Sequence, residues 1–148
     1  KSEDLIAFLQ EHKMPIPPEL RDGPVQILVV DDEPAITRLV SKAILAKHPE
    51  FRVEEAHDGF AAGSILATLK PDVVILDLRM PGMDGYEVCR LIKSREETRR
   101  AEVIAMTAYP SDESEQNIRQ CGARTCLHKP LEMQTLIEEV ESCLDSSA

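Results

Sequence analysis

The sequence predicts an α/β domain built on a doubly wound, five-stranded parallel sheet with the strand order 2-1-3-4-5. Two observations carry this prediction. After residue 24, five short apolar segments alternate with five segments of helical character, a pattern typical of parallel strands whose helices cover both faces of the sheet. Residues 73–76 form a continuous apolar run that ends at Asp77, as expected of a central strand buried on both sides.

Residues 1–24 precede this alternation and predict a short N-terminal helix followed by a proline-rich linker. Ser2 and the two acids after it suit a helix N-terminus, and residues 5–9 supply an apolar face. The prolines within residues 15–18 end the helix and stiffen the connection. We therefore expect two parts, the helix with its linker at 1–24 and a folded domain at 25–148.

The expected strands are short, apolar segments that end in polar or turn-forming residues. They lie at residues 25–30, 51–56, 73–77, 103–107 and 124–127. Each is followed by a helical segment, most of them with apolar residues three and four positions apart. These helical segments lie at residues 36–44, 61–69, 86–92, 111–121 and 131–144.

The helix expected at residues 111–121 differs from the others, because Ile118 is its only large apolar residue before Cys121. It has little surface to bury, so we expect it to be the least stable element of the domain. A modest ligand-dependent energy is enough to reposition such a helix. We therefore expect a signal to leave the domain through this helix, the strand after it and the last helix.

The composition excludes several classes of protein. The formal net charge of −10 argues against direct contact of this segment with nucleic acid, because phosphate contacts need a basic surface. No apolar run approaches the roughly 20 residues that span a bilayer, and the N-terminus lacks the apolar core of a signal peptide. The four cysteines form no CxxC pair, so we expect reduced, mostly buried thiols in a cytoplasmic protein. Because the chain begins at Lys1, we expect a piece of a longer protein.

Acidic residues follow two neighbouring strands of the predicted sheet. Asp31 and Asp32 follow the first strand, and Asp77 ends the third. In the order 2-1-3-4-5 these two strands flank the crevice where ligands bind. Three carboxylates in one crevice repel one another unless a cation lies among them, and oxygen ligands with open positions suit Mg²⁺, which commonly takes a further oxygen from a phosphate.

Two more polar side chains follow strands at the same edge, the hydroxyl of Thr107 and the ammonium of Lys129. A carboxylate such as Asp77 can attack phosphorus and form an acyl phosphate, while a metal and a lysine neutralise charge on the transferring group. Each residue also has a structural explanation, such as helix capping by Asp31 or Asp32. Their combination at one edge favours phosphoryl chemistry with Mg²⁺ as the cofactor.

Four sequence blocks contain these residues in order. They are VVDDEP at 29–34, ILDLRMPGMDG at 75–85, MTA at 106–108 and KP at 129–130. Together the blocks resemble the receiver domain of two-component response regulators, which has a flavodoxin-like fold, and the resemblance covers residues 25–145. It implies a phosphorylation-dependent signalling switch, with at most self-directed phosphotransfer and dephosphorylation, and not an enzyme with a diffusible product.

The resemblance also implies a role for each acidic residue. Asp77 would be the phosphoacceptor, loaded from a phosphohistidine of a sensor histidine kinase or a phosphotransfer protein. Asp32, Asp77 and the backbone carbonyl of Arg79 would bind Mg²⁺, and Asp31 would assist through a water molecule.

Thr107 would be the switch hydroxyl, and Lys129 would contact the phosphoryl group from a position fixed by a cis bond to Pro130. The family usually carries an aromatic switch residue three positions before this lysine, where the present chain has Cys126. A thiol is much smaller than a ring, so the usual coupled motion cannot occur in the same form. Tyr109 either substitutes for that ring or shields the rim of the pocket.

Arg79 is a second departure, since the family often has a smaller polar residue two positions after the acceptor. A cation there screens the phosphoryl group from water or pairs with an acid across the pocket mouth. It also disfavours a Mg²⁺-dependent phosphohydrolase, which needs a second acid at this position. Cys126 and the polar segment 111–121 motivate the alternative of a degenerate receiver that acts as a constitutive docking or dimerisation module.

Residues 2–9, with the sequence SEDLIAFL, resemble the closing helix of excisionase-like helix-turn-helix domains. This resemblance implies a DNA-binding domain upstream of the receiver, with residues 14–24 as the hinge. An ordinary amphipathic extension explains the pattern equally well.

Overall fold

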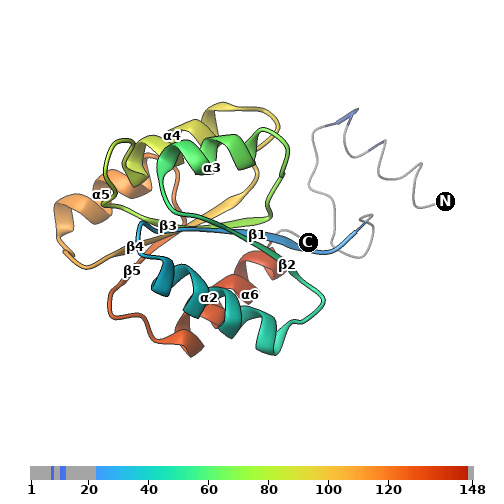
Figure 1. Cartoon of the computed structure of the whole chain (residues 1–148). Coiled ribbons are helices and arrows are strands. Elements are labelled where there is room, and N and C mark those ends of the chain that lie inside the picture. Colours follow the sequence, from blue (N-terminus) through green and yellow to red (C-terminus); the bar gives the residue numbers. More distant parts are fainter. Residues whose placement is uncertain (1–7, 9–10, 13–22, 147–148) are drawn as a thin grey trace.

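The computed structural model describes residues 8, 11–12 and 23–146 of the chain, so the helix and linker expected within residues 1–24 lie almost entirely outside the described residues. From residue 26 on, strands and helices alternate as the sequence predicts (Figure 1). The strands are β1 (Gln26–Val30), β2 (Arg52–Ala56), β3 (Val73–Asp77), β4 (Glu102–Thr107) and β5 (Thr125–His128). The helices are α2 (Pro34–Lys47), α3 (Gly59–Leu66), α4 (Gly85–Ser94), α5 (Asp112–Gln120) and α6 (Met133–Ser146).

The five strands form one sheet in the order β2-β1-β3-β4-β5, and every neighbouring pair is parallel. The predicted strand order is therefore confirmed. Figure 1 shows α3, α4 and α5 on one face of the sheet and α2 and α6 on the other. In this order β1 and β3 are direct neighbours, with Val30 opposite Leu76. The chain segments that leave these two strands consequently begin side by side.

The core has two halves, one on each face of the sheet. All five residues of β3 are buried, and alternate residues of the central strands belong to different halves. Leu28 and Leu76 pack beneath α3, α4 and α5, whereas Ile27 and Ile75 pack against α2 and α6. Burying one such side chain contributes about 1.5 to 3 kcal/mol. Burial on both faces explains why these strands are uninterrupted apolar runs.

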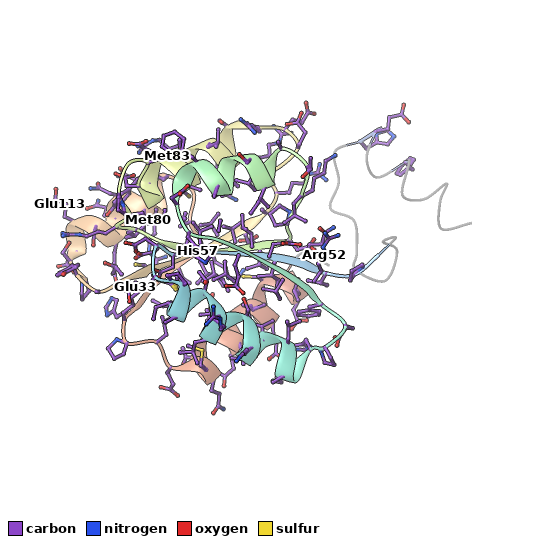
Figure 2. All side chains as sticks on the ribbon, in the orientation of Figure 1. Glu33, Arg52, His57, Met80, Met83 and Glu113 are labelled. Carbon is purple, nitrogen blue, oxygen red and sulfur yellow. The ribbon has the colours of Figure 1, made fainter. Side chains whose placement is uncertain are left out.

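The carboxyl ends of the strands share one edge of the sheet. In Figure 2, Glu33, Met80 and Glu113, which follow β1, β3 and β4, lie toward one end of the molecule, and Arg52, which begins β2, lies toward the other. The helices that leave this edge begin with local caps. Asp84 accepts a hydrogen bond from the backbone N–H of Glu87 at the start of α4, as N-cap residues do.

Two predictions about burial are confirmed. Ile118 is the only buried residue of α5. All four cysteines are free, with Cys89, Cys126 and Cys143 buried and Cys121 partly exposed. In the part of the chain that the structure describes, no helix combines the length and the apolar character that crossing a membrane requires.

Candidate functional site

Asp31 and Asp77 emerge side by side because β1 and β3 are paired. Asp31 directly follows β1 and Asp77 is the last residue of β3. Asp31 is completely buried, and Asp77 is only 4% exposed. Two buried carboxylates in adjacent positions destabilise the folded protein when both are ionised and no positive charge compensates them. This pair therefore needs compensating positive charge at this edge of the sheet.

A third carboxylate completes the cluster. Asp32 is exposed, and the oxygen atoms that Asp31, Asp32 and Asp77 can offer to a metal lie within 4.8 Å of one another. Hard oxygen donors of this kind, one of them open to solvent, fit Mg²⁺. The convergence that the sequence predicted from strand ends is present.

Lys129 supplies a positive charge from the end of β5, an edge strand of the sheet. It follows β5, and its ammonium nitrogen lies 2.6 Å from Oδ2 of Asp31 and 3.5 Å from Oδ1 of Asp77. Burial alone would lower the pKa of Lys129, but the contacts with Asp31 and Asp77 outweigh it and raise this pKa. The peptide bond to Pro130 is cis, as the sequence resemblance implies.

Asp77 has a strongly altered acidity. The pKa of Asp77 is raised to about 6, with burial as the largest cause and the negative charge of Asp31 acting in the same direction. Lys129 and a hydrogen bond from the backbone N–H of Arg79 oppose this shift. A carboxylate that is ionised with difficulty beside another carboxylate gains from any cation that joins the site.

Thr107 lies at the end of β4, and only 2% of its surface is exposed. Its hydroxyl oxygen accepts a hydrogen bond from the backbone N–H of Tyr109 at 3.0 Å. Its carbonyl oxygen accepts one from the backbone N–H of Lys129 at 2.8 Å. The proton of the Thr107 hydroxyl remains available for an acceptor, and the threonine is tied to the segment that carries the lysine.

Arg79 and Tyr109 form a contact that sequence reasoning missed. The guanidinium carbon of Arg79 lies 4.3 Å from the centre of the Tyr109 ring, within the range of a cation–π interaction. The ring is 63% exposed. The arginine and the tyrosine thus join the loop after β3 to the loop after β4, at a solvent-exposed ring. The nearness of each to the site in the sequence was the only signal that could have pointed to the pair.

Cys126 lies inside the core. It is in β5 opposite Ala105, is 9% exposed and belongs to the half of the core beneath α3, α4 and α5. The position where the family usually has an aromatic ring is therefore filled by a small apolar side chain.

Gly85 is a second feature that sequence reasoning did not single out. It begins α4, and a Cβ atom there would collide with the carbonyl oxygen of Asp77 and lie 2.7 Å from the Cα atom of Leu78. Only glycine lets the first turn of α4 approach the end of β3 this closely. The loop between them, which carries Arg79, is closed by this contact.

Comparisons with known proteins agree with this geometry. The family model of the response regulator receiver domain matches residues 27–141 of this chain. The DNA-binding dual master transcriptional regulator RpaA of Synechocystis is 32% identical over 119 residues, which are 80% of this chain and 48% of RpaA. Response regulator PleD of Caulobacter vibrioides is 37% identical over 117 residues, which are 79% of this chain and 25% of PleD.

A solved structure agrees as well. The signal receiver domain of the DNA binding response regulator protein (merR) from Colwellia psychrerythraea 34H has a TM-score of 0.78 and 36% identity, and the match covers 82% of this chain and 98% of that one. The chain spans about half or less of the length of the two curated relatives but nearly all of this solved receiver domain. The chain belongs to the family of response regulator receiver domains.

Proposed function

We propose that this chain is a signalling switch in which Asp77 accepts a phosphoryl group from a phosphohistidine of a sensor histidine kinase or a phosphotransfer protein. Membership of the receiver family supports a phosphorylation-dependent signalling role. The observation that carries the finer proposal is the convergence of Asp31, Asp32 and Asp77 beside Lys129. A nucleophilic carboxylate, a cation site and a lysine are the components that phosphoryl transfer requires.

We propose that Asp32, Asp77 and the carbonyl oxygen of Arg79 hold Mg²⁺ and that Asp31 assists through a water molecule. The hydrogen bonds of Asp31 support this division. Its Oδ1 accepts the backbone N–H of Glu33 at 2.9 Å, and its Oδ2 accepts the ammonium of Lys129 at 2.6 Å. Bound Mg²⁺ supplies positive charge that neutralises the oxygens of the transferring group.

The proposed transfer needs few protein groups. One carboxylate oxygen of Asp77 attacks phosphorus, the bond from phosphorus to the histidine nitrogen breaks, and the released imidazole takes a proton from solvent. The ammonium of Lys129, 3.5 Å from Asp77, pairs with one oxygen of the arriving phosphoryl group. The Thr107 hydroxyl donates its proton in a hydrogen bond to another oxygen of the phosphoryl group. A new hydrogen bond thereby forms between β4 and the modified residue.

A small-molecule phosphodonor tests the proposal. The reduced protein is incubated with the donor, with and without Mg²⁺, and its intact mass and the released phosphate are followed over time. We expect a Mg²⁺-dependent gain of one phosphoryl group that is absent from Asp77→Asn. Absence of an adduct would favour a docking module that does not use its phosphoryl site, and continuous release of phosphate without an adduct would favour a hydrolase.

We also propose that residues 1–24 link the receiver, residues 25–148, to a DNA-binding domain of a longer protein. Two of the similar proteins, RpaA and the protein from Colwellia psychrerythraea, are named as DNA-binding. The charge of −10 on the present chain suits a control module better than a DNA contact. The coding sequence upstream of Lys1 is expected to encode a helix-turn-helix domain. An upstream sequence that encodes no such domain would contradict this proposal.

A further inference from the structure

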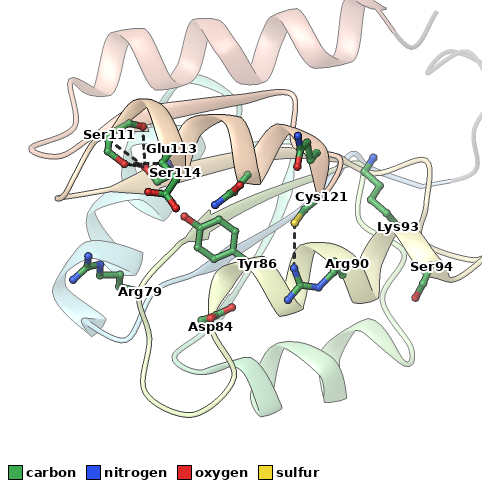
Figure 3. A pocket seen from close by; sticks show the side chains of 12 residues that line it. Arg79, Asp84, Tyr86, Arg90, Lys93, Ser94, Ser111, Glu113, Ser114 and Cys121 are labelled. Atoms are coloured by element: carbon green, nitrogen blue, oxygen red, sulfur yellow. Dashed lines mark hydrogen bonds between the residues drawn. The ribbon is translucent and has the colours of Figure 1, made fainter.

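A groove with a volume of about 860 Å³ lies between α4 and α5. Figure 3 shows Tyr86 and Arg90 of α4 on one side of it, Ser114 of α5 on the other, and Cys121 toward one end. Only Arg79, among the residues discussed for phosphoryl transfer, reaches its lining. The chemistry at the Cys121 end is therefore distinct from that of the acid cluster.

Cys121 is the one partly exposed cysteine among the four. It directly follows α5, and a guanidinium nitrogen of Arg90 lies 3.3 Å from its sulfur, the contact drawn as a dashed line in Figure 3. Sulfur is the nucleophilic atom of cysteine, and this contact places it beside a guanidinium. The groove thus presents a partly exposed sulfur beside a guanidinium.

A second thiol, that of Cys89, lies against the backbone of Cys121. Cys89 precedes Arg90 on α4 and is completely buried, and its sulfur donates a hydrogen bond to the carbonyl oxygen of Cys121 at 3.4 Å. Burial is the main cause that raises the pKa of Cys89 to about 11. At neutral pH the pair therefore consists of an accessible sulfur next to Arg90 and a protonated thiol against its backbone.

The backbone at Cys121 is held against α4 by more than this hydrogen bond. Gly122 has φ of +109° and closes α5 with two reversed hydrogen bonds, from Gly122 to Arg119 and from Ala123 to Ile118, the Schellman arrangement. A Cβ atom at Gly122 would lie 2.7 Å from the side chain of Lys93. The close approach of α5 to α4 at the two thiols is therefore built into the fold.

We propose that Cys121 and Cys89 form an oxidation site for a small hydroperoxide, whose product is a disulfide that joins α5 to α4. In the first step the Cys121 thiolate attacks a peroxide oxygen, the O–O bond breaks, and the leaving hydroxide takes a proton, which gives a sulfenic acid and water when the oxidant is hydrogen peroxide. In the second step the Cys89 sulfur attacks the Cys121 sulfur, the S–O bond breaks, and the hydroxide leaves as water with the Cys89 proton. Two thiols lose two electrons and the peroxide gains them.

The disulfide would constrain α5, the helix that the sequence predicts to be the least stable. Only Ile118 of α5 is buried, so the helix has little hydrophobic anchoring. A covalent bond at its C-terminal end would restrict movement of α5 relative to α4. This consequence does not depend on phosphorylation of Asp77.

Hydrogen peroxide added to the reduced full chain tests the proposal. We expect a mass loss of two hydrogens, a peptide pair that links residues 89 and 121, and full reversal by a thiol reductant. Cys121→Ser is expected to abolish the reaction, and Cys89→Ser to stop it at a sulfenic acid on residue 121 that dimedone traps. Arg90→Gln is expected to slow it several-fold. Cys143→Ser, a buried thiol on the other face of the sheet, is the matched control and is expected to change nothing.

Three results would overturn the proposal. They are a disulfide between two chains through Cys121, a sulfenic acid on the wild-type protein that never proceeds to a disulfide, and peroxide reactivity of Cys121 no faster than that of Cys126 or Cys143. The last comparison uses the folded wild-type protein alone, so it remains decisive even if Cys89→Ser does not fold.

Discussion

The ammonium nitrogen of Lys129 lies 2.6 Å from Oδ2 of Asp31, closer than its 3.5 Å separation from the carboxylate of Asp77. Asp31 is completely buried, so this lysine is its main charge compensation. A phosphoryl group on Asp77 would compete with Asp31 for the same ammonium. The two aspartates are thus coupled through one side chain, and loss of Lys129 should affect both stability and metal binding.

Lys129→Met is expected to lower the free energy of unfolding in the presence of EDTA by about 3 kcal/mol, because it leaves a buried charge without its partner. Saturating Mg²⁺ should restore more stability to this variant than to the wild type, since the cation replaces the lost charge. Urea unfolding with and without Mg²⁺ measures both effects. Lys47→Met, which removes a surface pair with Glu141, should cost less than about 1 kcal/mol and show no such metal dependence. Equal behaviour of the two variants would refute the coupling.

Asp77→Asn is expected to stabilise the metal-free protein at neutral pH. The folded-state pKa of about 6 lies above the ordinary aspartate value of 3.8, so the folded protein binds more protons between these values and loses stability as pH rises through them. The asparagine avoids this loss, which reaches up to about 3 kcal/mol at about 1.4 kcal/mol for each pKa unit. The difference from wild type should be largest at neutral pH and vanish once the pH falls below the unfolded pKa of 3.8. Asp145→Asn, an exposed acid in α6, is the control, and a pH-independent difference for Asp77→Asn would contradict the assignment.

Arg79→Ala is expected to shorten the lifetime of the acyl phosphate on Asp77, because it removes a guanidinium, two residues after the acceptor, that stacks on Tyr109. Tyr109→Ala should have a similar effect, and the double variant should be no faster than the more affected single variant, since both remove one contact. Decay of the phosphorylated protein after removal of the donor gives the rates. Arg52→Ala, at the opposite end of the molecule (Figure 2), is the control. Unchanged decay in Arg79→Ala would rule out a shielding role.

The convergence of Asp31, Asp32 and Asp77 followed from the sequence, because alternation determines which strands are neighbours and every carboxyl end of a parallel sheet reaches the same edge. Finer contacts did not follow. Asp31 and Asp32 had an alternative as helix caps, but the N-cap of α2 is Glu33 and makes no side-chain capping bond. That detail depends on the path of a loop and on side-chain rotamers, which no periodicity in the sequence records.

Contacts between helices were equally hidden. Cys89 and Cys121 are 32 positions apart, and their contact depends on how α4 and α5 pack at Gly122. The stacking of Arg79 on Tyr109 joins two loops. The sequence predicted that both loops lie near the site, but it did not predict the direction of either side chain. Sequence patterns report which face of an element is buried, but the separation of two elements depends on the side chains that fit between them.

Movement of α5 can be measured directly. With Mg²⁺ and beryllofluoride as a phosphoryl mimic, we expect amide hydrogen exchange to change in residues 112–120, because a single buried residue, Ile118, anchors this helix. Residues 34–47 of α2, which bury four residues including Val40 and Ile44, serve as the internal control. Exchange in α5 that ignores the mimic would refute the proposed route of the signal.

The most direct measurement of the central claim is to locate the phosphoryl group. The protein is treated with a small phosphodonor and Mg²⁺ and then reduced with borohydride, which converts an aspartyl phosphate to homoserine. We predict homoserine at residue 77 in the peptide map, dependent on both the donor and Mg²⁺. Homoserine at another aspartate, or none at residue 77 under conditions that saturate the metal, would contradict the account.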